Sequence, residues 1–243
     1  MPKSLSHLDG ELEFKFQDQH LFVVEKPPSL HSVGEGDSLE GRLKSKFAQL
    51  GGLKDAGLVQ RLDFETTGVL VGGFTEQIAT ELKHGLSVGR FAKSYLVLVE
   101  GACTRGSVVE GYLFSRYRGS AKVSMKTKDG KRSLISRSVV LPIATVGSVS
   151  LVRVDCALAR RHQVRVHMAS IGFPLVGDAL YGAKMKLTDI GVTDHGSDFV
   201  LVAESVSFSH PVTKELVTAK ATLTSEALLQ RLQGSGASVR ADR

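Results

Sequence analysis

The sequence lacks most features that mark secreted, membrane-spanning or metal-stabilised proteins. Its only cysteines, Cys103 and Cys156, are far apart and fit neither a disulfide framework nor a zinc-binding pattern. There is no run of about 18 apolar residues, as a membrane-spanning helix requires. The first residues also lack the apolar core of a secretory signal. We therefore expect a cytoplasmic protein that spans no membrane and binds no structural metal.

Common nucleotide-binding and metal-binding patterns are also absent. None of the 25 glycines forms a G-x-x-x-x-G-K-[ST] loop, or a G-x-G-x-x-G loop between a strand and a helix. His162 and His167 are five residues apart, so on a helix they would lie about 140° apart and could not share a ligand face. A paired-carboxylate glycosidase would need a second acid facing Asp63, and Glu65 is only a sequence neighbour.

The charge is basic, with 31 Lys and Arg residues against 25 Asp and Glu residues and a sequence pI of about 9.3. This balance favours a polyanionic partner such as RNA, because phosphate neutralisation supplies much of the affinity for nucleic acids. Many basic proteins bind no nucleic acid, so charge alone does not decide the partner. The 243 residues show no repeat or linker, and we expect one domain.

Hydrophobic periodicity predicts more strands than helices. The predicted strands cover residues 11–16, 20–26, 57–63, 68–74, 91–101, 150–159 and 199–211, with several short ones between 106 and 149. The predicted helices cover residues 38–50, 75–86, 160–172 and 225–234. Because many strands are consecutive, we predict an α+β protein with a mixed, largely antiparallel central β-sheet flanked by helices.

One candidate site lies in VQRLDFETTG, residues 59–68, where an apolar run breaks into polar residues. Asp63 could cap a turn, bind a metal or attack a substrate, and most aspartates in such places only satisfy backbone N–H groups. Thr66 or Thr67 is expected to satisfy backbone groups of the turn. The local sequence leaves these alternatives open.

A second candidate is a run of cationic residues that follows a predicted strand. On a helix, Arg161 and Arg165 would lie one turn apart and project together. Such a cluster repels itself unless an anion faces it, although surface solvation is the simpler explanation for any run of charge.

Five separate motifs resemble those of the RluA-type pseudouridine synthases. They are QRLDFETTG at residues 60–68, ARRHQVRVHMASIGFPLVGDALYG at 159–182, KSYLVLVEG from Lys93, VVEKPPSLHS from Val23, and FSHP at 208–211. The motifs occur in the family's order and span residues 20 to 220. The first two are long and specific, so chance similarity is a poor explanation.

This resemblance implies isomerisation of specific uridines in tRNA or rRNA to pseudouridine, without a cofactor, in a central RNA-binding cleft. Asp63 would be the essential carboxylate that initiates cleavage of the base–ribose bond. Tyr95 would lie against the base and assist proton removal from C5, and Arg165 would pair with Asp63. An arginine suits this role because it opposes the rise in carboxylate pKa that burial under RNA would cause. Arg61 would fill the space left by the flipped nucleotide.

Further RNA contacts are expected from residues of the two long motifs, namely Gln60, Arg160, Arg161, His162 and Gln163. The sequence departs from the family pattern at three positions. Gln60 replaces the usual histidine, Ala159 replaces a glycine, and Arg161 replaces a small polar residue. These changes leave open a rival function, a non-catalytic RNA-binding or ribosome-assembly factor on the same scaffold.

The expected organisation is an N-terminal strand extension (1–19), a catalytic domain (20–233) and a flexible tail (234–243). We expect a monomer without the extra N-terminal S4 domain of many relatives. The basic region 116–132 is either an RNA-clasping hairpin or an exposed, solvated loop.

Overall fold

The computed structural model describes residues 12–115, 120–130, 133–193, 195–234 and 239–240. Internal contacts divide the chain into two compact units, and neither is continuous in sequence. The first, called here the Asp63 unit, contains Met1–Lys93 and Val202–Leu223. The second, called the Tyr95 unit, contains Ser94–Leu201 and Thr224–Arg243. The prediction of one catalytic domain over residues 20–233 stays a prediction.

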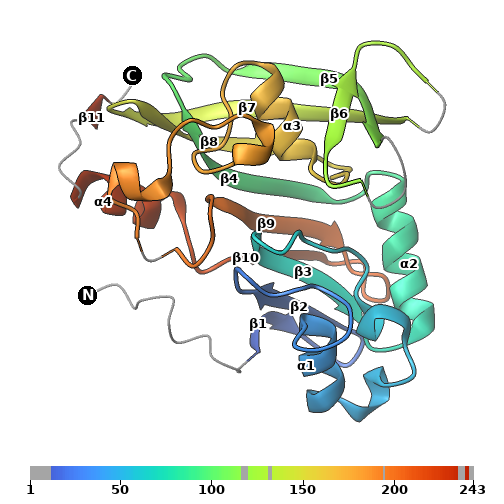
Figure 1. Cartoon of the computed structure of the whole chain (residues 1–243). Helices are drawn as coiled ribbons and strands as arrows, with labels where there is room; N and C mark the ends of the chain where they lie inside the picture. The colour runs from blue at the N-terminus through green and yellow to red at the C-terminus, as the bar shows by residue number, and fades with distance from the viewer. Residues whose placement is uncertain (1–11, 116–119, 131–132, 194, 235–238, 241–243) are drawn as a thin grey trace. The chain divides into compact units, whose positions relative to one another are not determined.

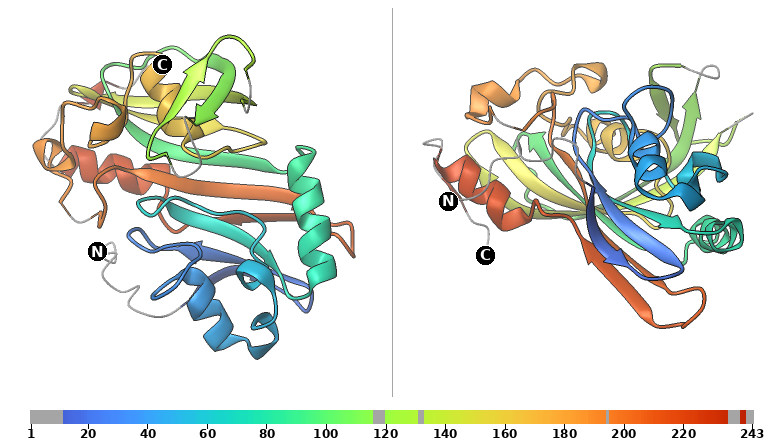
Figure 2. Two further views of the ribbon diagram at one scale, coloured as in Figure 1. Left: turned by 45° about the vertical axis from the view of Figure 1, so that its right-hand side comes forward. Right: turned by 90° about the horizontal axis from the view of Figure 1, so that it is seen from below.

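The Asp63 unit is built on five strands in the order β1-β2-β3-β9-β10. They are β1 (Glu13–Gln17), β2 (Leu21–Lys26), β3 (Thr67–Gly73), β9 (Leu201–Ser209) and β10 (Leu216–Lys220). All pairs are antiparallel except β3 with β9, which is parallel. β9 and β10 form the long orange-red hairpin of Figure 2.

The parallel pair explains the last residue of the QRLDFETTG motif. Gly68 pairs with Ala203 and has a φ of +114°, a conformation that side chains disfavour. A Cβ at Gly68 would lie 2.3 Å from the carbonyl oxygen of Ala203. Only glycine therefore lets the chain pass from the Asp63 loop into β3 at this close approach.

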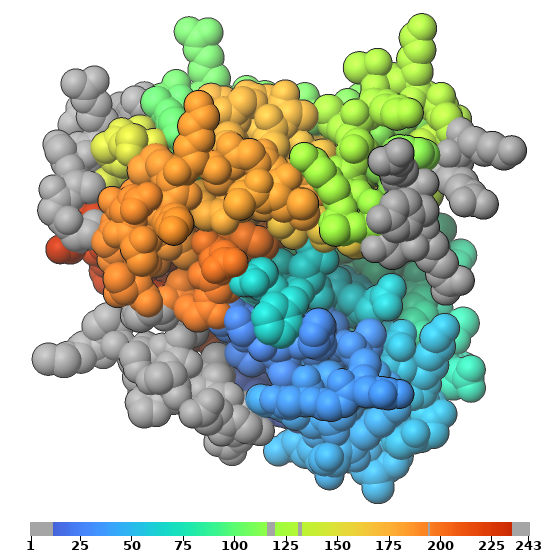
Figure 3. All heavy atoms as spheres, viewed as in Figure 1, coloured from blue at the N-terminus to red at the C-terminus, as the bar shows by residue number. Residues whose placement is uncertain are grey.

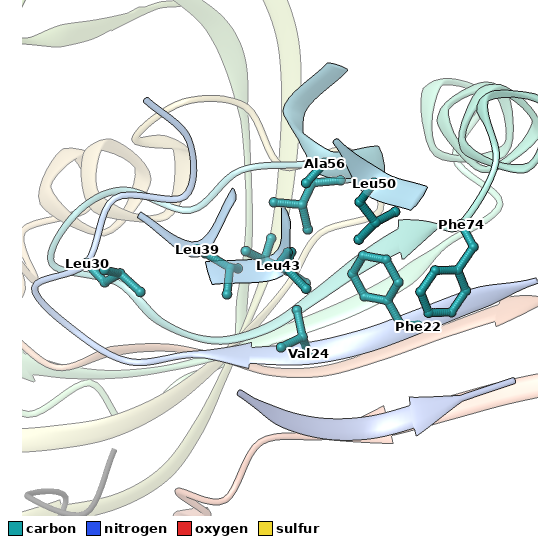
Figure 4. Close-up of a cluster of buried hydrophobic side chains, with 10 residues drawn as sticks. Phe22, Val24, Leu30, Leu39, Leu43, Leu50, Ala56 and Phe74 are labelled. Atoms are coloured by element: carbon teal, nitrogen blue, oxygen red, sulfur yellow. The ribbon is translucent and has the colours of Figure 1, made fainter. Parts of the chain in front are cut away.

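Two helices cover this sheet. Helix α1 (Leu39–Lys46) begins at Ser38, whose hydroxyl accepts a hydrogen bond from the Gly41 N–H. Its Leu39 and Leu43 are fully buried in a cluster with β2 side chains, including Phe22 and Val24 (Figure 4). The 3-10 turns η2 (Ala48–Leu50) and η3 (Lys54–Gly57) follow. The burial of this apolar cluster stabilises the unit.

Helix α2 (Glu76–Ser87) is capped by Thr75, whose hydroxyl accepts a hydrogen bond from the Ile78 N–H. It packs close to β3 because Gly73 has no side chain. A Cβ at Gly73 would lie 2.6 Å from the backbone nitrogen of Ala79.

The Tyr95 unit has an antiparallel sheet in the order β4-β8-β7-β5-β6, and β11 also pairs with β7 (Figure 1). The strands are β4 (Ala92–Glu100), β5 (Ser107–Ser115), β6 (Val123–Lys126), β7 (Leu134–Val146), β8 (Val149–Asp155) and β11 (Val239–Arg240). The helices are α3 (Gln163–Ser170) and α4 (Ser225–Gly234), with 3-10 turns η4 (Ala179–Tyr181) and η5 (Leu187–Ile190). Helix α3 contacts β6 and β7, and α4 contacts β7 and β8.

The structure confirms the α+β class and the mixed, largely antiparallel pairing. The strand predicted over 57–63 is wrong, because only Leu58 makes a bridge, to Gly72, and residues 60–63 form a loop. Parts of the basic region (116–119 and 131–132) and most of the predicted tail lie outside the described residues. The described part of the basic region includes β6, and residues 239–240 form β11.

Candidate active site

Asp63 lies on the loop that leads into β3 and is half-buried. Its carbonyl accepts a hydrogen bond from the Thr66 N–H at 3.1 Å, which closes a tight turn around the carboxylate-bearing residue. The hydroxyl of Thr67 donates to the carbonyl of Lys26 at 2.7 Å. Thr67 therefore satisfies a backbone group, as predicted for one of the two threonines, and ties the loop to the end of β2.

Lys26 is fully buried beneath this loop. Its Nζ donates hydrogen bonds to three backbone carbonyls, those of Pro27 at 2.8 Å, Leu30 at 2.7 Å and Phe64 at 3.2 Å. Three acceptors match the three N–H donors of an ammonium group. Because Phe64 follows Asp63 directly, Lys26 holds the backbone next to the candidate carboxylate.

The electrostatic environment of Lys26 also involves Asp63. Burial lowers the pKa of Lys26 to about 7, while the negative charges of Asp63 and Glu65 act in the opposite direction. The three carbonyl acceptors of Nζ favour the protonated form of the amine.

Ser32 makes a second tie between the same two segments. Its buried hydroxyl donates to the Leu62 carbonyl at 2.8 Å and accepts from the Leu62 N–H at 2.9 Å. The segment after β2 and the Asp63 loop are thus held together on both sides of the aspartate. Figure 3 shows blue and turquoise atoms of these two parts of the chain exposed next to one another. Gln60 is half-buried and Arg61 is exposed on the same loop.

In the Tyr95 unit, Tyr95 lies on β4, where it pairs with Val154 of β8. Only 6% of its surface is exposed. The strand position fixes the direction of the ring, because alternate residues of a strand point to opposite faces.

Arg165, on α3, is buried and held in a fixed orientation by Asp178. Its Nε donates to Asp178 Oδ2 at 2.6 Å and its Nη2 donates to Asp178 Oδ1 at 2.7 Å. The guanidinium lies 5.1 Å from the Tyr181 ring centroid and 4.5 Å from that of Phe199. This bidentate pair and the two rings orient the cation, and the Asp178 and Tyr181 contacts come from the G-D-x-x-Y-G part of the second long motif.

The spacing predicted for the two arginines is wrong. His162 has a left-handed backbone conformation, with a φ of 54°, and α3 begins only at Gln163. Arg161 therefore precedes the helix and does not lie one helical turn from Arg165. Its guanidinium donates to the carbonyls of Ser120 at 2.7 Å and Ala121 at 3.3 Å, next to β6.

Tyr181 joins this cluster to the strand β6. Its hydroxyl accepts a hydrogen bond from the Val123 N–H at 3.0 Å and contacts His162 Nδ1 at 2.9 Å. Burial raises the pKa of Tyr181. Lys122 lies over the ring, 5.4 Å from its centroid. Arg161 and His162 thus help to position β6, the latter through Tyr181. The anion that pairs with Arg165 in this structure is Asp178.

Gln163 and His167 make internal hydrogen bonds that hold α3 on β7. The buried Gln163 side chain accepts from the Arg160 N–H at 3.0 Å and donates to the Arg137 carbonyl at 3.0 Å. His167 is fully buried, with Nε2 2.9 Å from the Ser136 hydroxyl and Nδ1 2.9 Å from that of Ser138. Burial lowers the pKa of His167 to about 4, so it is neutral at pH 7. The RNA contacts expected from Arg160, Arg161, His162 and Gln163 stay predictions.

Within the described part of the chain, no three His, Cys, Asp or Glu side chains gather in a way that could hold a metal ion. None of its helices is both long and apolar enough to cross a membrane.

The positioning residues that sequence reasoning missed are Lys26, Ser32, Asp178 and Tyr181. All four lie inside motifs already quoted, but their partners are set by tertiary contacts that spacing does not reveal.

The fold and these loops define an α+β protein with a buried lysine under an aspartate loop and a bidentate arginine site. Comparison with known proteins gives the family. The family model described as RNA pseudouridylate synthase matches residues 20–170. The chain therefore belongs to the RNA pseudouridylate synthase family, a family of enzymes.

Two relatives are both named ribosomal large subunit pseudouridine synthase D. The protein of Xanthomonas campestris is 32% identical over 238 residues, which cover 93% of this chain and 70% of the relative. The protein of Pseudomonas aeruginosa is 31% identical over 186 residues, which cover 75% of this chain but only 57% of the relative. A solved structure, human RNA Pseudouridylate Synthase Domain Containing 4, has a TM-score of 0.71 at 20% identity and covers 95% of this chain and 94% of its own. This last likeness supports the fold.

Proposed function

We propose that the protein isomerises uridine in RNA to pseudouridine, with Asp63 as the essential carboxylate. The observation that carries this proposal is the fixed position of the Asp63 loop, held by Lys26 at Phe64 and by Ser32 at Leu62. A catalytic group must be held in position before the substrate arrives, and these ties do so from both sides.

The reaction breaks the bond between N1 of the base and C1′ of the ribose and forms a bond from C5 to C1′. The C5 proton leaves and N1 gains a proton, so no atom is added overall and no cofactor is required by the balance. Asp63 initiates cleavage, Tyr95 lies against the base and assists removal of the C5 proton, and Arg165 pairs with Asp63. The bidentate hold of Asp178 on Nε and Nη2 of Arg165 fixes the direction in which the rest of the guanidinium can act.

RNA access requires the target base to leave its stack, which costs a few kcal/mol unless the base is already unpaired. Arg61 is exposed on the Asp63 loop, as a residue that fills the vacated space must be. Gln60, Arg160, Arg161, His162 and Gln163 are proposed as further RNA contacts. For Arg161 and Gln163, hydrogen bonds within the protein mean that any contact uses their remaining donors or acceptors.

The substrate that we propose is ribosomal RNA of the large subunit, because the names of both relatives described above contain the words ribosomal large subunit. A tRNA is the alternative. The test uses C5-tritiated transcripts of large-subunit rRNA and of a tRNA mixture, each incubated with the full chain. Tritium release from the rRNA alone supports the proposal, and release from tRNA alone reassigns the substrate. Binding of both RNAs without release from either would support the non-catalytic assembly factor instead.

A further inference from the structure

The Asp63 loop carries an exposed aromatic side chain that the catalytic roles above do not use. Phe64 follows Asp63 directly, and 41% of its surface is exposed. Its ring lies against the imidazole of His31, with centroids 4.7 Å apart and planes inclined by 45°. His31 is also exposed. Two aromatic rings from segments more than thirty residues apart thus form one surface patch, called here the His31–Phe64 patch.

Hydrogen bonds to the backbone hold the two segments that carry the His31–Phe64 patch. The carbonyl of Phe64 is bound by the buried Lys26, and the residue after His31, Ser32, makes both hydrogen bonds to Leu62. The His31 carbonyl accepts from the N–H of Leu39, at the first residue of α1, at 2.9 Å. Backbone groups of His31, Leu62 and Phe64 are therefore held by hydrogen bonds, which lowers the conformational entropy lost when the rings bind a ligand.

The two apolar side chains of the loop, Leu62 and Phe64, point in different directions. Leu62 packs against the buried cluster of the Asp63 unit, whereas Phe64 is turned outward. Phe64 and His31 thus place two exposed rings next to a candidate catalytic residue. Arg61, exposed on the same loop, supplies a positive charge of the kind that an RNA backbone neutralises.

We propose that the His31–Phe64 patch is a stacking platform for a nucleobase next to the target uridine. Aromatic side chains bind unpaired bases through their faces, and such stacking accepts any base. The platform would hold the neighbour of the flipped uridine and so bring the target to Asp63. This inference rests on the proposed RNA substrate but assigns a role to two residues outside the catalytic set.

The chain contains no tryptophan, which permits a direct optical test. Phe64→Trp places a single indole in the patch, and Leu216→Trp places one at the exposed position 216 on β10 as a matched control. The probes are a single-stranded oligouridylate of about ten nucleotides and an abasic ribose-phosphate oligomer of the same length and charge. Binding of each end-labelled probe is followed separately by fluorescence anisotropy.

At saturation, the oligouridylate should quench the indole of Phe64→Trp, the abasic oligomer should not, and Leu216→Trp should respond to neither. Saturated binding without quenching would overturn the stacking platform. Failure of both probes to bind would contradict the platform and the RNA substrate together, so the two proposals fail in distinguishable ways.

Kinetics give a second readout. Phe64→Leu keeps an apolar side chain but removes the ring, and it should lower kcat/KM for tritium release from the rRNA transcript by about 5- to 150-fold. Phe64→Tyr keeps the ring and should restore turnover to within about twofold of the wild type, since base stacking needs only the aromatic face. Equal kcat/KM for Phe64→Leu and the wild type would contradict the proposal.

Discussion

The hydroxyl of Ser32 makes both hydrogen bonds of Leu62, donating to its carbonyl at 2.8 Å and accepting from its N–H at 2.9 Å. One side chain thus replaces the backbone pairing with β3 that the Asp63 loop lacks after Val59, whose N–H donates to the Val71 carbonyl. The loop has a defined conformation without being a strand, and the residue next to Asp63 is its point of attachment.

The first prediction concerns this attachment. Ser32→Ala removes both hydrogen bonds and leaves the N–H and carbonyl of Leu62 without these partners, so the free energy of unfolding should fall by about 1–3 kcal/mol. Ser45→Ala is the matched control, because the Ser45 hydroxyl donates only to the Gly41 carbonyl on the exposed side of α1. Urea unfolding of both variants measures the difference. Equal stability of Ser32→Ala and Ser45→Ala would show that the attachment contributes nothing.

The second prediction compares two bidentate arginine–carboxylate pairs of nearly identical geometry. Arg165–Asp178 is buried, whereas Arg42–Asp37 has donor–acceptor distances of 2.8 and 2.7 Å at an exposed carboxylate. Asp178→Asn leaves a buried cation without its counter-charge and should lower the free energy of unfolding by about 3–5 kcal/mol. Asp37→Asn should change it by less than about 1 kcal/mol, since water screens the exposed pair.

The buried Arg165–Asp178 pair determines which variants can test the role of Arg165 in the reaction. Arg165→Met leaves the Asp178 carboxylate buried without the guanidinium, so loss of activity in that variant can reflect loss of structure. The double variant Arg165→Met with Asp178→Asn removes both charges, and it should keep more of its stability than Arg165→Met alone while remaining inactive. Recovery of turnover in the double variant would contradict a role for Arg165 in the reaction.

The third prediction is a pH dependence of stability that arises from His167. Its folded pKa of about 4 lies below the reference value of 6.5, so between these values the unfolded chain binds the extra proton. Stability should therefore fall as the pH is lowered through this window, by about 3 kcal/mol in total from this residue. Urea unfolding between pH 7.5 and pH 4 should show a shallower slope for His167→Gln than for the wild type. The exposed control His84→Gln should keep the wild-type slope, and an unchanged slope in His167→Gln would contradict the assignment.

Periodicity predicted most of the fold because the side chains that define it are local. The strands predicted over residues 11–16 and 20–26 correspond to β1 and β2, and the helix predicted over residues 75–86 corresponds to α2. The prediction failed at residues 57–63 because pairing with β3 stops after Leu58 and Val59, while Leu62 uses its hydrogen bonds on Ser32. A side chain thirty residues away is not visible in the local pattern.

The candidate site was predictable to the extent that it lies in long motifs. Asp63, Tyr95 and Arg165 were found through the resemblance, but the groups that hold them were not. Lys26 ends a buried strand in VVEKPP, and a charged residue at the end of an apolar run was an available signal. The left-handed backbone at His162 shifts the start of α3, and no residue type in RRHQVR indicates it.

The most direct test of the account is tritium release from C5-tritiated large-subunit rRNA by Asp63→Asn. Asp55→Asn is the control, because Asp55 has a left-handed backbone conformation that asparagine tolerates. The account predicts tritium release by the wild type and by Asp55→Asn. Release by Asp63→Asn should be no greater than in a sample without enzyme, although this variant should still bind RNA and keep the wild-type stability against urea. Turnover by Asp63→Asn close to that of the wild type would contradict the central role of this carboxylate.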